Sequence, residues 1–331
     1  MNIILDDYNE KYNNTLASVY SEYLCEALER TKDVVHVECD LGLSLFKMDM
    51  PNLLENYPDR MINVGIAEAN GVGFASGLSQ EGFTPFVHSF APFMSRRVMD
   101  QVFISGAYSK ANVKILGSDP GVSAAFNGGT HMPFEDIAIM RVIPEIKIIE
   151  LTDNVAAKAL LPMIEKDRGM YYVRMIRSNV AKIYQEGSTF EIGKGNVLRE
   201  GDDVTIISYG LMVQESLKAA DLLKEKGISA RVVDMFTIRP LDKDLVVECA
   251  KKTGAIVTAE NHSVNGGLGD AVSQVIMEEH ICPVHRIAVQ EQFGQTGPMP
   301  FLMEEYCLTA ESIAQAAIKA IESKKTAGVS L

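Results

Sequence analysis

Glu68 and His131 are the two residues of this sequence whose type and setting most suggest proton chemistry. Glu68 lies near the start of a helix predicted within residues 62–82, after a short apolar strand and Gly65. His131 closes a loop, residues 117–131, whose many small side chains are typical of a functional loop. Carboxylic acids and imidazoles often act as general acids and bases in enzymes. We therefore treat both residues as candidate catalytic groups.

Each of the two residues also has an ordinary structural explanation. A glutamate in the first turn of a helix usually complements the helix dipole or closes a capping box, and a single histidine is often held by structural hydrogen bonds. The helix behind Glu68, however, aligns Ala69, Gly73 and Gly77, although an interior glycine costs roughly 1 kcal/mol relative to alanine. Such a row allows close approach, so we expect this helix to be buried against a partner helix or a cofactor.

Further candidate residues follow predicted strands. They are Asp40, Leu41 and Ser44 in residues 33–44, Phe90 and Phe93 after residues 84–89, and Arg177 at the end of residues 170–177. Ligands bind at the carboxyl ends of strands in open parallel sheets. The aromatic side chains could stack on a planar heterocycle, and the arginine could hold a phosphate or carboxylate. A turn, core packing and a surface salt bridge are the respective alternatives.

Composition limits the class of protein. The 331 residues suffice for two domains, and 47% apolar with 23% charged residues is typical of a globular protein. A net charge of −13 disfavours nucleic acid and anionic membranes as partners. No apolar run approaches the ~20 residues of a membrane span. Five cysteines without a CxxC pair, and no recognisable signal peptide, predict the reducing cytoplasm.

Alternating strand and helix patterns predict an α/β protein of two consecutive three-layer αβα domains with mostly parallel sheets. A polar, glycine-rich stretch begins near Tyr184, so we assign residues 1–184 to the first domain and 185–331 to the second. The second domain lacks the common phosphate-binding and zinc-protease motifs. His280 and His285 do not have the spacing of metal ligands on a helix. We therefore predict no metal site in this chain.

The order of four motifs resembles the transketolase family. These are CDLGLS (39–44), NVGIAEANGVGFASGL (63–78), NGGTHMPFED (127–136) and IRSN (176–179). The resemblance covers nearly the whole chain and implies a transketolase pyrimidine-binding domain followed by a transketolase C-terminal domain. It also implies a thiamine diphosphate enzyme that transfers a two-carbon ketol unit between a phosphorylated ketose and an aldose.

The resemblance assigns roles to individual positions. Cofactor contacts fall on Asp40, Leu41, Glu68, Phe90, Phe93 and Arg96, and substrate contacts fall on Ser44, Asp119, Asn127, His131 and Arg177. Glu68 matches the acid that bonds the aminopyrimidine ring and favours the imino tautomer that removes the thiazolium proton. Holding a proton there requires a pocket that excludes water. His131 matches a histidine that bonds the donor sugar, and Ser44 and Arg177 match phosphate contacts.

Four positions depart from the pentose-phosphate enzyme of the family. Asn127 replaces an aspartate, Asp119 replaces a histidine as in 1-deoxyxylulose-5-phosphate synthases, Arg96 replaces a third aromatic residue, and Ala17 replaces an arginine. A buried phosphate needs charge-assisted partners. The loss of one such partner favours a donor or acceptor other than the ordinary pentose phosphates.

The sequence lacks the GDG motif and the following asparagine through which such enzymes hold Mg²⁺ and the diphosphate. We therefore expect a split transketolase, whose amino-terminal subunit carries the GDG motif and the Mg²⁺ and shares thiamine diphosphate with this chain. Two copies of each subunit would form an α2β2 heterotetramer, and this chain alone would be inactive.

Three other functions stay open. One is the β subunit of a 2-oxoacid dehydrogenase, which shares the two-domain plan and the pair Asp100 and Gln101. Another is an enzyme similar to deoxyxylulose-phosphate synthase. The third, without catalysis, is a transketolase-like scaffold or regulatory subunit, which the presence of Glu68 and His131 disfavours.

Overall fold

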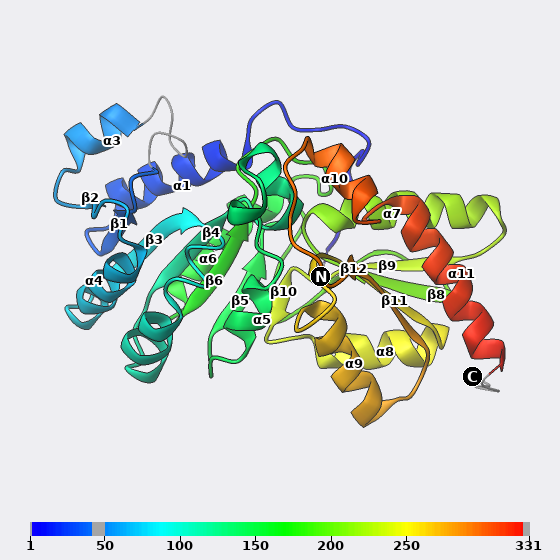
Figure 1. The fold of residues 1–331 in the computed structure, drawn as a ribbon. Helices are drawn as coiled ribbons and strands as arrows, with labels where there is room; N and C mark the ends of the chain where they lie inside the picture. The colour runs from blue at the N-terminus through cyan, green and yellow to red at the C-terminus, as the bar shows by residue number, and fades with distance from the viewer. Residues whose placement is uncertain (1, 42–49, 327–331) are drawn as a thin grey trace.

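The computed structural model describes residues 2–41 and 50–326. The described chain forms two α/β units, each built on its own sheet, as Figure 1 shows. The candidate Ser44 lies outside the described residues. None of the described helices is both long and apolar enough to cross a membrane.

The first sheet has seven strands in the order β10-β5-β6-β4-β3-β1-β2. Their bounds are Val34–Glu38 (β1), Met61–Asn63 (β2), Thr84–Phe90 (β3), Lys114–Ser118 (β4), Lys147–Glu150 (β5), Tyr171–Met175 (β6) and Thr237–Arg239 (β10). All neighbouring strands are parallel except β10, which runs antiparallel to β5. The central strands are buried on both faces, which explains their nearly continuous apolar sequences.

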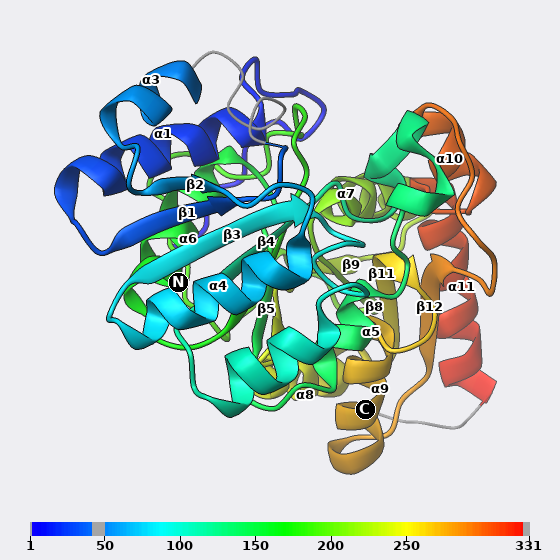
Figure 2. The same ribbon diagram turned by 60° about the vertical axis from the view of Figure 1, so that its left-hand side comes forward.

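Helices cover both faces of the first sheet. They are α1 (Leu16–Arg30), α3 (Met50–Asn56), α4 (Glu68–Gln80), α5 (Asp136–Arg141) and α6 (Asn154–Lys166), with a π-helix η1 (Gln101–Tyr108) and two 3-10 helices, η2 (Gly121–Asn127) and η3 (Gly129–His131). Helix α1 packs against α6, and α4 packs against η1 and β3. Figure 2 shows α4 in front of β3 and α6 behind it. Neighbouring residues of a strand face opposite sides of the sheet. Phe86 therefore packs into the apolar core that includes α1, whereas Val87 packs into the core that includes α4.

The second sheet has five strands in the order β12-β11-β8-β9-β7. Its strands are Asn196–Arg199 (β7), Val204–Ser208 (β8), Ala230–Asp234 (β9), Ile256–Ser263 (β11) and Val284–Val289 (β12), and only β7 pairs antiparallel. Its helices are α7 (Leu211–Glu225), α8 (Lys243–Thr253), α9 (Leu268–Glu279), α10 (Met299–Glu305) and α11 (Ala310–Thr326). Helix α7 packs on α11, and α8 packs on α9. The predicted fold class is confirmed.

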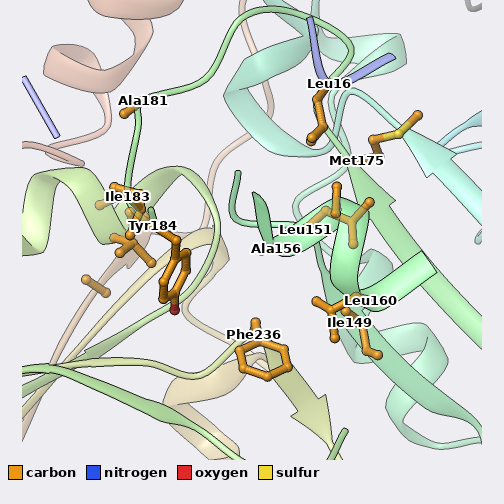
Figure 3. Close-up of a cluster of buried hydrophobic side chains, with 14 of the residues drawn as sticks. Leu16, Ile149, Leu151, Ala156, Leu160, Met175, Ala181, Ile183, Tyr184 and Phe236 are labelled. Carbon is orange, nitrogen blue, oxygen red and sulfur yellow. The ribbon is translucent and has the colours of Figure 1, made fainter. Parts of the chain in front are cut away.

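Two buried apolar clusters each contain residues from both halves of the chain. Strand β10 comes from the second half yet extends the first sheet. Figure 3 shows Tyr184 and Phe236 directed into a cluster of apolar side chains that includes Ile149 and Leu160. The fully buried Arg174 of β6 pairs with Asp136 at 2.8 Å and with Glu150, and it donates to the carbonyl oxygen of Asn261 in β11. The halves are therefore held by apolar packing and by a buried polar network.

Candidate active site

Glu68 is the first residue of α4 and only 2% of its surface is exposed. Its Oε1 accepts a hydrogen bond from Ser89 at 3.1 Å, and its Oε2 accepts one from the Nη1 atom of Arg97 at 2.5 Å. Ser89 lies near the carboxyl end of β3, so the strand and the helix together position the carboxylate. Each carboxylate oxygen of Glu68 therefore accepts a hydrogen bond from a side chain.

Three aromatic rings meet beside Glu68. Phe90 ends β3 and Phe93 follows it, and the His131 ring lies edge-on to both at 5.1 Å between ring centres. The guanidinium of Arg97 lies 4.2 Å above the Phe93 ring, and that of Arg177 lies 4.7 Å above the Phe90 ring. Contacts thus run without interruption from Glu68 through Arg97 and the aromatic group to Arg177.

His131 ends the 3-10 helix η3 and is partly buried. Burial, and then the positive charges of Arg96 and Arg97, lower the pKa of His131 below its ordinary value. Its Nδ1 atom lies 2.9 Å from the hydroxyl of Thr130. The histidine is therefore neutral at neutral pH and can exchange hydrogen bonds with a polar ligand.

Asp119 and Arg177 form an ion pair at the carboxyl ends of the adjacent strands β4 and β6. The Nε atom and the backbone nitrogen of Arg177 donate to Asp119 at 2.7 and 3.1 Å. Asp119 is buried and has a positive φ of 52°. The side chain of Asn261 from β11 holds the following turn by bonding the nitrogen of Val122 and the carbonyl of Pro120. The second half of the chain thus supports the Asp119 turn.

The predicted residues Asp40 and Leu41 follow β1 in a tight turn. Asp40 is exposed, has a φ of +63°, and accepts a hydrogen bond from the side chain of Asn63 at 3.0 Å. The backbone nitrogen of Leu41 donates to Glu38 at 2.7 Å. Asn63 also bonds the nitrogen of Gly65, and so links this turn to the entry of α4.

The described residues contain one group of three side chains placed closely enough to hold a metal ion, namely His36, Glu38 and His88. These side chains lie on the α1 side of the sheet, whereas Ser89 and Glu68 lie on the α4 side. Their remaining ring nitrogens lie 3.0 Å from the hydroxyl of Tyr20 and 3.1 Å from that of Ser118. Hydrogen bonds within the chain therefore occupy the possible ligand atoms of His36, Glu38 and His88 without a metal ion.

The pKa of Glu38 lies well below its ordinary value. Burial alone would raise it, but the charge of His88 and hydrogen bonds from His36 and His88 outweigh burial. The ionised carboxylate can therefore keep its bond to the Leu41 nitrogen, which fixes the turn after β1.

The other predicted site residues lie nearer the surface. Arg96 is nearly half exposed, pairs with Glu135 at 3.1 Å and donates to the carbonyl oxygen of Thr130. It thereby holds the segment that carries His131. Asn127 is exposed at the end of η2. The structure therefore brings together Glu68, Phe90, Phe93, Asp119, His131 and Arg177, with Arg96 at the edge of this group.

Three residues that the sequence does not single out, Ser89, Arg97 and Asn63, bond Glu68 and the turn after β1. A sequence signal exists for Arg97, because it lies four residues after Phe93 at a predicted helical corner, a spacing that brings side chains together. Ser89 and Asn63 both lie at strand ends, but nothing in their local sequence identifies their partners.

Two expected elements also differ. The segment after Pro92, which the sequence places at a strand-to-helix corner, forms turns and then the π-helix η1. The glycine-rich stretch before His131 folds into η2 and η3 rather than an irregular loop. Neither short helix type has a strong sequence periodicity of its own.

The residues of this site fit the pyrimidine half of thiamine diphosphate. A nearly buried carboxylate beside two phenylalanine rings offers a proton-bonding group and stacking surfaces for a planar aminopyrimidine. Mg²⁺ and a diphosphate require several hard oxygen ligands. The described residues include no group of three carboxylates suited to such an ion. The described residues of this site therefore fit the pyrimidine ring of the cofactor.

Among the residues that the structure describes, none covers the row of small residues at Gly73 and Gly77 of helix α4. A Cβ atom added at Gly73 or Gly77 would have no neighbour within 4 Å. Three large apolar side chains are also exposed: Ile66 lies just before α4, Phe74 lies on α4, and Ile104 lies on η1. The expected burial of this row against a partner helix or a cofactor stays a prediction.

Comparison with known proteins identifies related chains. A family model described as the pyrimidine binding domain of transketolase matches residues 14–182, and the model of the transketolase C-terminal domain matches residues 193–313. The boundary after residue 184 stays a prediction.

Two relatives are similar over nearly their full lengths. The 6-deoxy-6-sulfo-D-fructose transketolase subunit SqwH of Clostridium sp. (strain MSTE9) is 42% identical over 93% of this chain and 95% of its own. One of the subunits of the apulose-4-phosphate transketolase of Phocaeicola vulgatus is 34% identical over 94% of this chain and 99% of its own.

A solved structure has the same fold. It is a split-gene transketolase in an inactive β4 tetramer, 37% identical, with a TM-score of 0.85 over 95% of this chain and all of that one. These similarities confirm the resemblance of the sequence motifs. The chain belongs to the transketolase family and corresponds to the carboxyl-terminal subunit of its split members.

Proposed function

We propose that this chain, together with an amino-terminal subunit, transfers a two-carbon ketol unit from a ketose to an aldose with thiamine diphosphate as cofactor. The observation that carries this proposal is the buried Glu68 beside Phe90, Phe93 and His131 at the carboxyl ends of parallel strands. Similarity to two transketolase subunits supports the reaction class.

The residues of the chain have distinct tasks in this reaction. Thiamine diphosphate, when bound, would supply a carbon nucleophile. Glu68 holds a proton at a nitrogen of the aminopyrimidine, in a position from which water is excluded. Phe90 and Phe93 orient the ring by stacking. His131, neutral because its pKa is lowered, bonds hydroxyl groups of the donor sugar.

An amino-terminal partner completes the site. It holds the diphosphate and Mg²⁺ through a GDG motif, and the two subunits form an α2β2 assembly. The uncovered face of α4 and the exposed Ile66, Phe74 and Ile104 support a subunit contact there. The inactive β4 tetramer of the related split transketolase supports the expectation that this chain needs its partner. Five free thiols support a reducing compartment, the cytoplasm.

The donor is a ketose with an anionic group at its far end, for which a phosphorylated ketose is our first choice. Arg177 lies at the site and suits such a group, although Asp119 partly neutralises its charge. The names of the two relatives include one sulfonated and one phosphorylated sugar, so a sulfonate is the second choice.

Reconstitution tests the reaction class. We expect the chain mixed with its diphosphate-binding partner, Mg²⁺ and thiamine diphosphate to transfer a ketol unit from a phosphorylated or sulfonated ketose to an aldose. Neither subunit alone should do so. Pyruvate consumption by the mixture would instead indicate a deoxyxylulose-phosphate-type synthase or an oxoacid dehydrogenase, and full activity of a Glu68→Ala variant would indicate a scaffold role.

A further inference from the structure

Arg97 contacts both groups that a bound pyrimidine ring requires from this chain. Its Nη1 atom lies 2.5 Å from Oε2 of Glu68, and its guanidinium lies 4.2 Å above the Phe93 ring. One arginine side chain therefore bonds the candidate proton-holding group and covers the candidate stacking surface at the same time.

The remaining oxygen of Glu68 is also engaged. Ser89 donates to Oε1 at 3.1 Å, so each carboxylate oxygen of Glu68 already has a partner within this chain. Burying a carboxylate without partners is costly. The ion pair with Arg97 thus offsets that cost.

The two partners of this ion pair differ greatly in exposure. The Glu68 side chain is 2% exposed, whereas the Arg97 side chain is 45% exposed. Arg97 can therefore turn toward solvent without opening the core, while Glu68 has to stay in place. The mobile partner of the pair is the arginine.

We propose that Arg97 is a positioning residue that occupies the pyrimidine site until the cofactor displaces it. A pyrimidine ring that bonds Oε2 of Glu68 and stacks on Phe93 needs the same oxygen and the same aromatic ring as the guanidinium. Cofactor binding therefore breaks the Arg97 ion pair, and part of the binding free energy is spent on this step. This inference rests on the proposed function, because it presumes that the ligand is thiamine diphosphate.

The same contact explains how a split enzyme keeps its site formed before assembly. While Glu68 is paired, it remains aligned with Ser89 at the start of α4, and the cofactor meets an oriented carboxylate. Arg97 therefore lowers the affinity for the cofactor while it maintains the geometry of the site.

Cofactor affinity of the assembled enzyme tests this competition. Arg97→Met keeps an aliphatic side chain over Phe93 but removes the charge. We expect thiamine diphosphate to bind about fivefold more tightly to an assembly with this variant, measured by titration calorimetry in Mg²⁺. Arg97→Lys keeps the charge without the planar fork and should bind with an affinity between those of Arg97→Met and the unsubstituted enzyme.

Arg30→Met is the matched control. Arg30 pairs with Glu165 at 2.6 Å, and the two side chains are 51% and 8% exposed, so this ion pair resembles that of Arg97. It lies on α1 and α6, away from the aromatic group. The control should leave cofactor affinity unchanged, which separates the loss of an ion pair in general from the loss of this competitor.

The outcomes separate the inference from the proposed function. If the unsubstituted assembly binds no thiamine diphosphate, the proposed function is wrong. If it binds the cofactor but Arg97→Met binds equally or less tightly, Arg97 does not compete and only the inference is overturned. If Arg97→Met fails to assemble, Arg97→Lys decides the question, since equal or weaker binding by that variant also overturns the inference.

Discussion

Glu68 and His131 occupy contrasting surroundings within one site. Glu68 is almost fully buried and bonded by Ser89 and Arg97, whereas His131 is partly exposed and lies near two arginines. A buried carboxylate can hold a proton where water is excluded, and a partly exposed imidazole can form hydrogen bonds with an incoming sugar. The two side chains are thus suited to the cofactor and the substrate, respectively.

Removing the charge of Arg96 should raise the pKa of His131. Burial, Arg96 and Arg97 all lower this pKa, and Arg96→Gln removes one of the two charges. We expect the pKa of His131 to rise at low ionic strength, and added salt to reduce this rise. Histidine NMR signals, followed as a function of pH, measure it.

Arg286→Gln serves as the control for this titration, because Arg286 pairs with Asp270 in the second half of the chain. Its effect on the pKa of His131 should be negligible. An unchanged or lowered pKa in Arg96→Gln would show that Arg96 does not act on the imidazole.

At the scale of elements, regular amphipathic segments could be predicted from the sequence. In residues 14–30 the apolar side chains recur on one helical face, which predicts the helix observed as α1 (Leu16–Arg30), and the strand expected at 84–89 is β3 (Thr84–Phe90). Both have a clear period in their apolar residues. The π-helix η1 and the 3-10 helices η2 and η3 could not be predicted, because tertiary contacts rather than local pattern determine such short elements.

For a similar reason, only some residues of the candidate active site could be predicted from the sequence. Strand ends and glycine spacing indicated Glu68 and the aromatic corner, since ligands gather where parallel strands end. The pairing of Asp119 with Arg177 joins residues 58 positions apart, and the hydrogen bond that the Val122 nitrogen donates to Asn261 spans 139 positions. Contacts at such separations depend on the completed fold.

Enlarging Gly73 should block subunit assembly while the chain itself stays folded. An added Cβ at this helical position meets no atom within 4 Å, so Gly73→Gln has room in the isolated chain. We expect it to stabilise α4 by about 0.5 kcal/mol, because glutamine is a better helix former than glycine. The same side chain would prevent close approach of a partner helix.

Thermal unfolding and sedimentation velocity check the two parts of this prediction. Gly73→Ala is the control of smaller size, and it should raise stability while it interferes less with assembly. Normal assembly of Gly73→Gln with the amino-terminal subunit would mean that this face of α4 is not an interface.

At the scale of the whole molecule, the two halves are joined by a shared sheet and a buried polar network. Strand β10 crosses into the first sheet, and Arg174 ties Asp136 and Glu150 to Asn261 of the second half. The sequence predicted two successive domains but not this exchange, because a strand of three residues carries too weak a pattern to reveal its partner. The second half thereby supports the turn that carries Asp119.

Asp234 makes the contact between the halves dependent on pH. It is fully buried, and its Oδ2 accepts hydrogen bonds from Thr152 and Tyr184 at 2.7 Å. Burial raises the pKa of Asp234 to about 7, although these two bonds oppose the rise. Between pH 4 and 7 the folded chain therefore retains a proton that the unfolded chain releases, and stability falls as pH rises.

Replacing Asp234 with asparagine should remove this loss. The free energy of unfolding of Asp234→Asn, taken relative to that of the unsubstituted chain, should increase by more than about 1 kcal/mol from pH 5 to pH 8. Denaturant unfolding at the two pH values measures the gain. A difference in stability that does not change with pH would contradict the raised pKa of Asp234.

The central claim is that Glu68 activates thiamine diphosphate in a site completed by a second subunit. Exchange of the thiazolium carbon-bound proton with deuterium, followed by NMR in the assembled enzyme, tests it most directly. The account predicts rapid exchange in the unsubstituted assembly and exchange at least about 100-fold slower with Glu68→Gln, at unchanged subunit stoichiometry. Equal exchange rates in the two assemblies would contradict it.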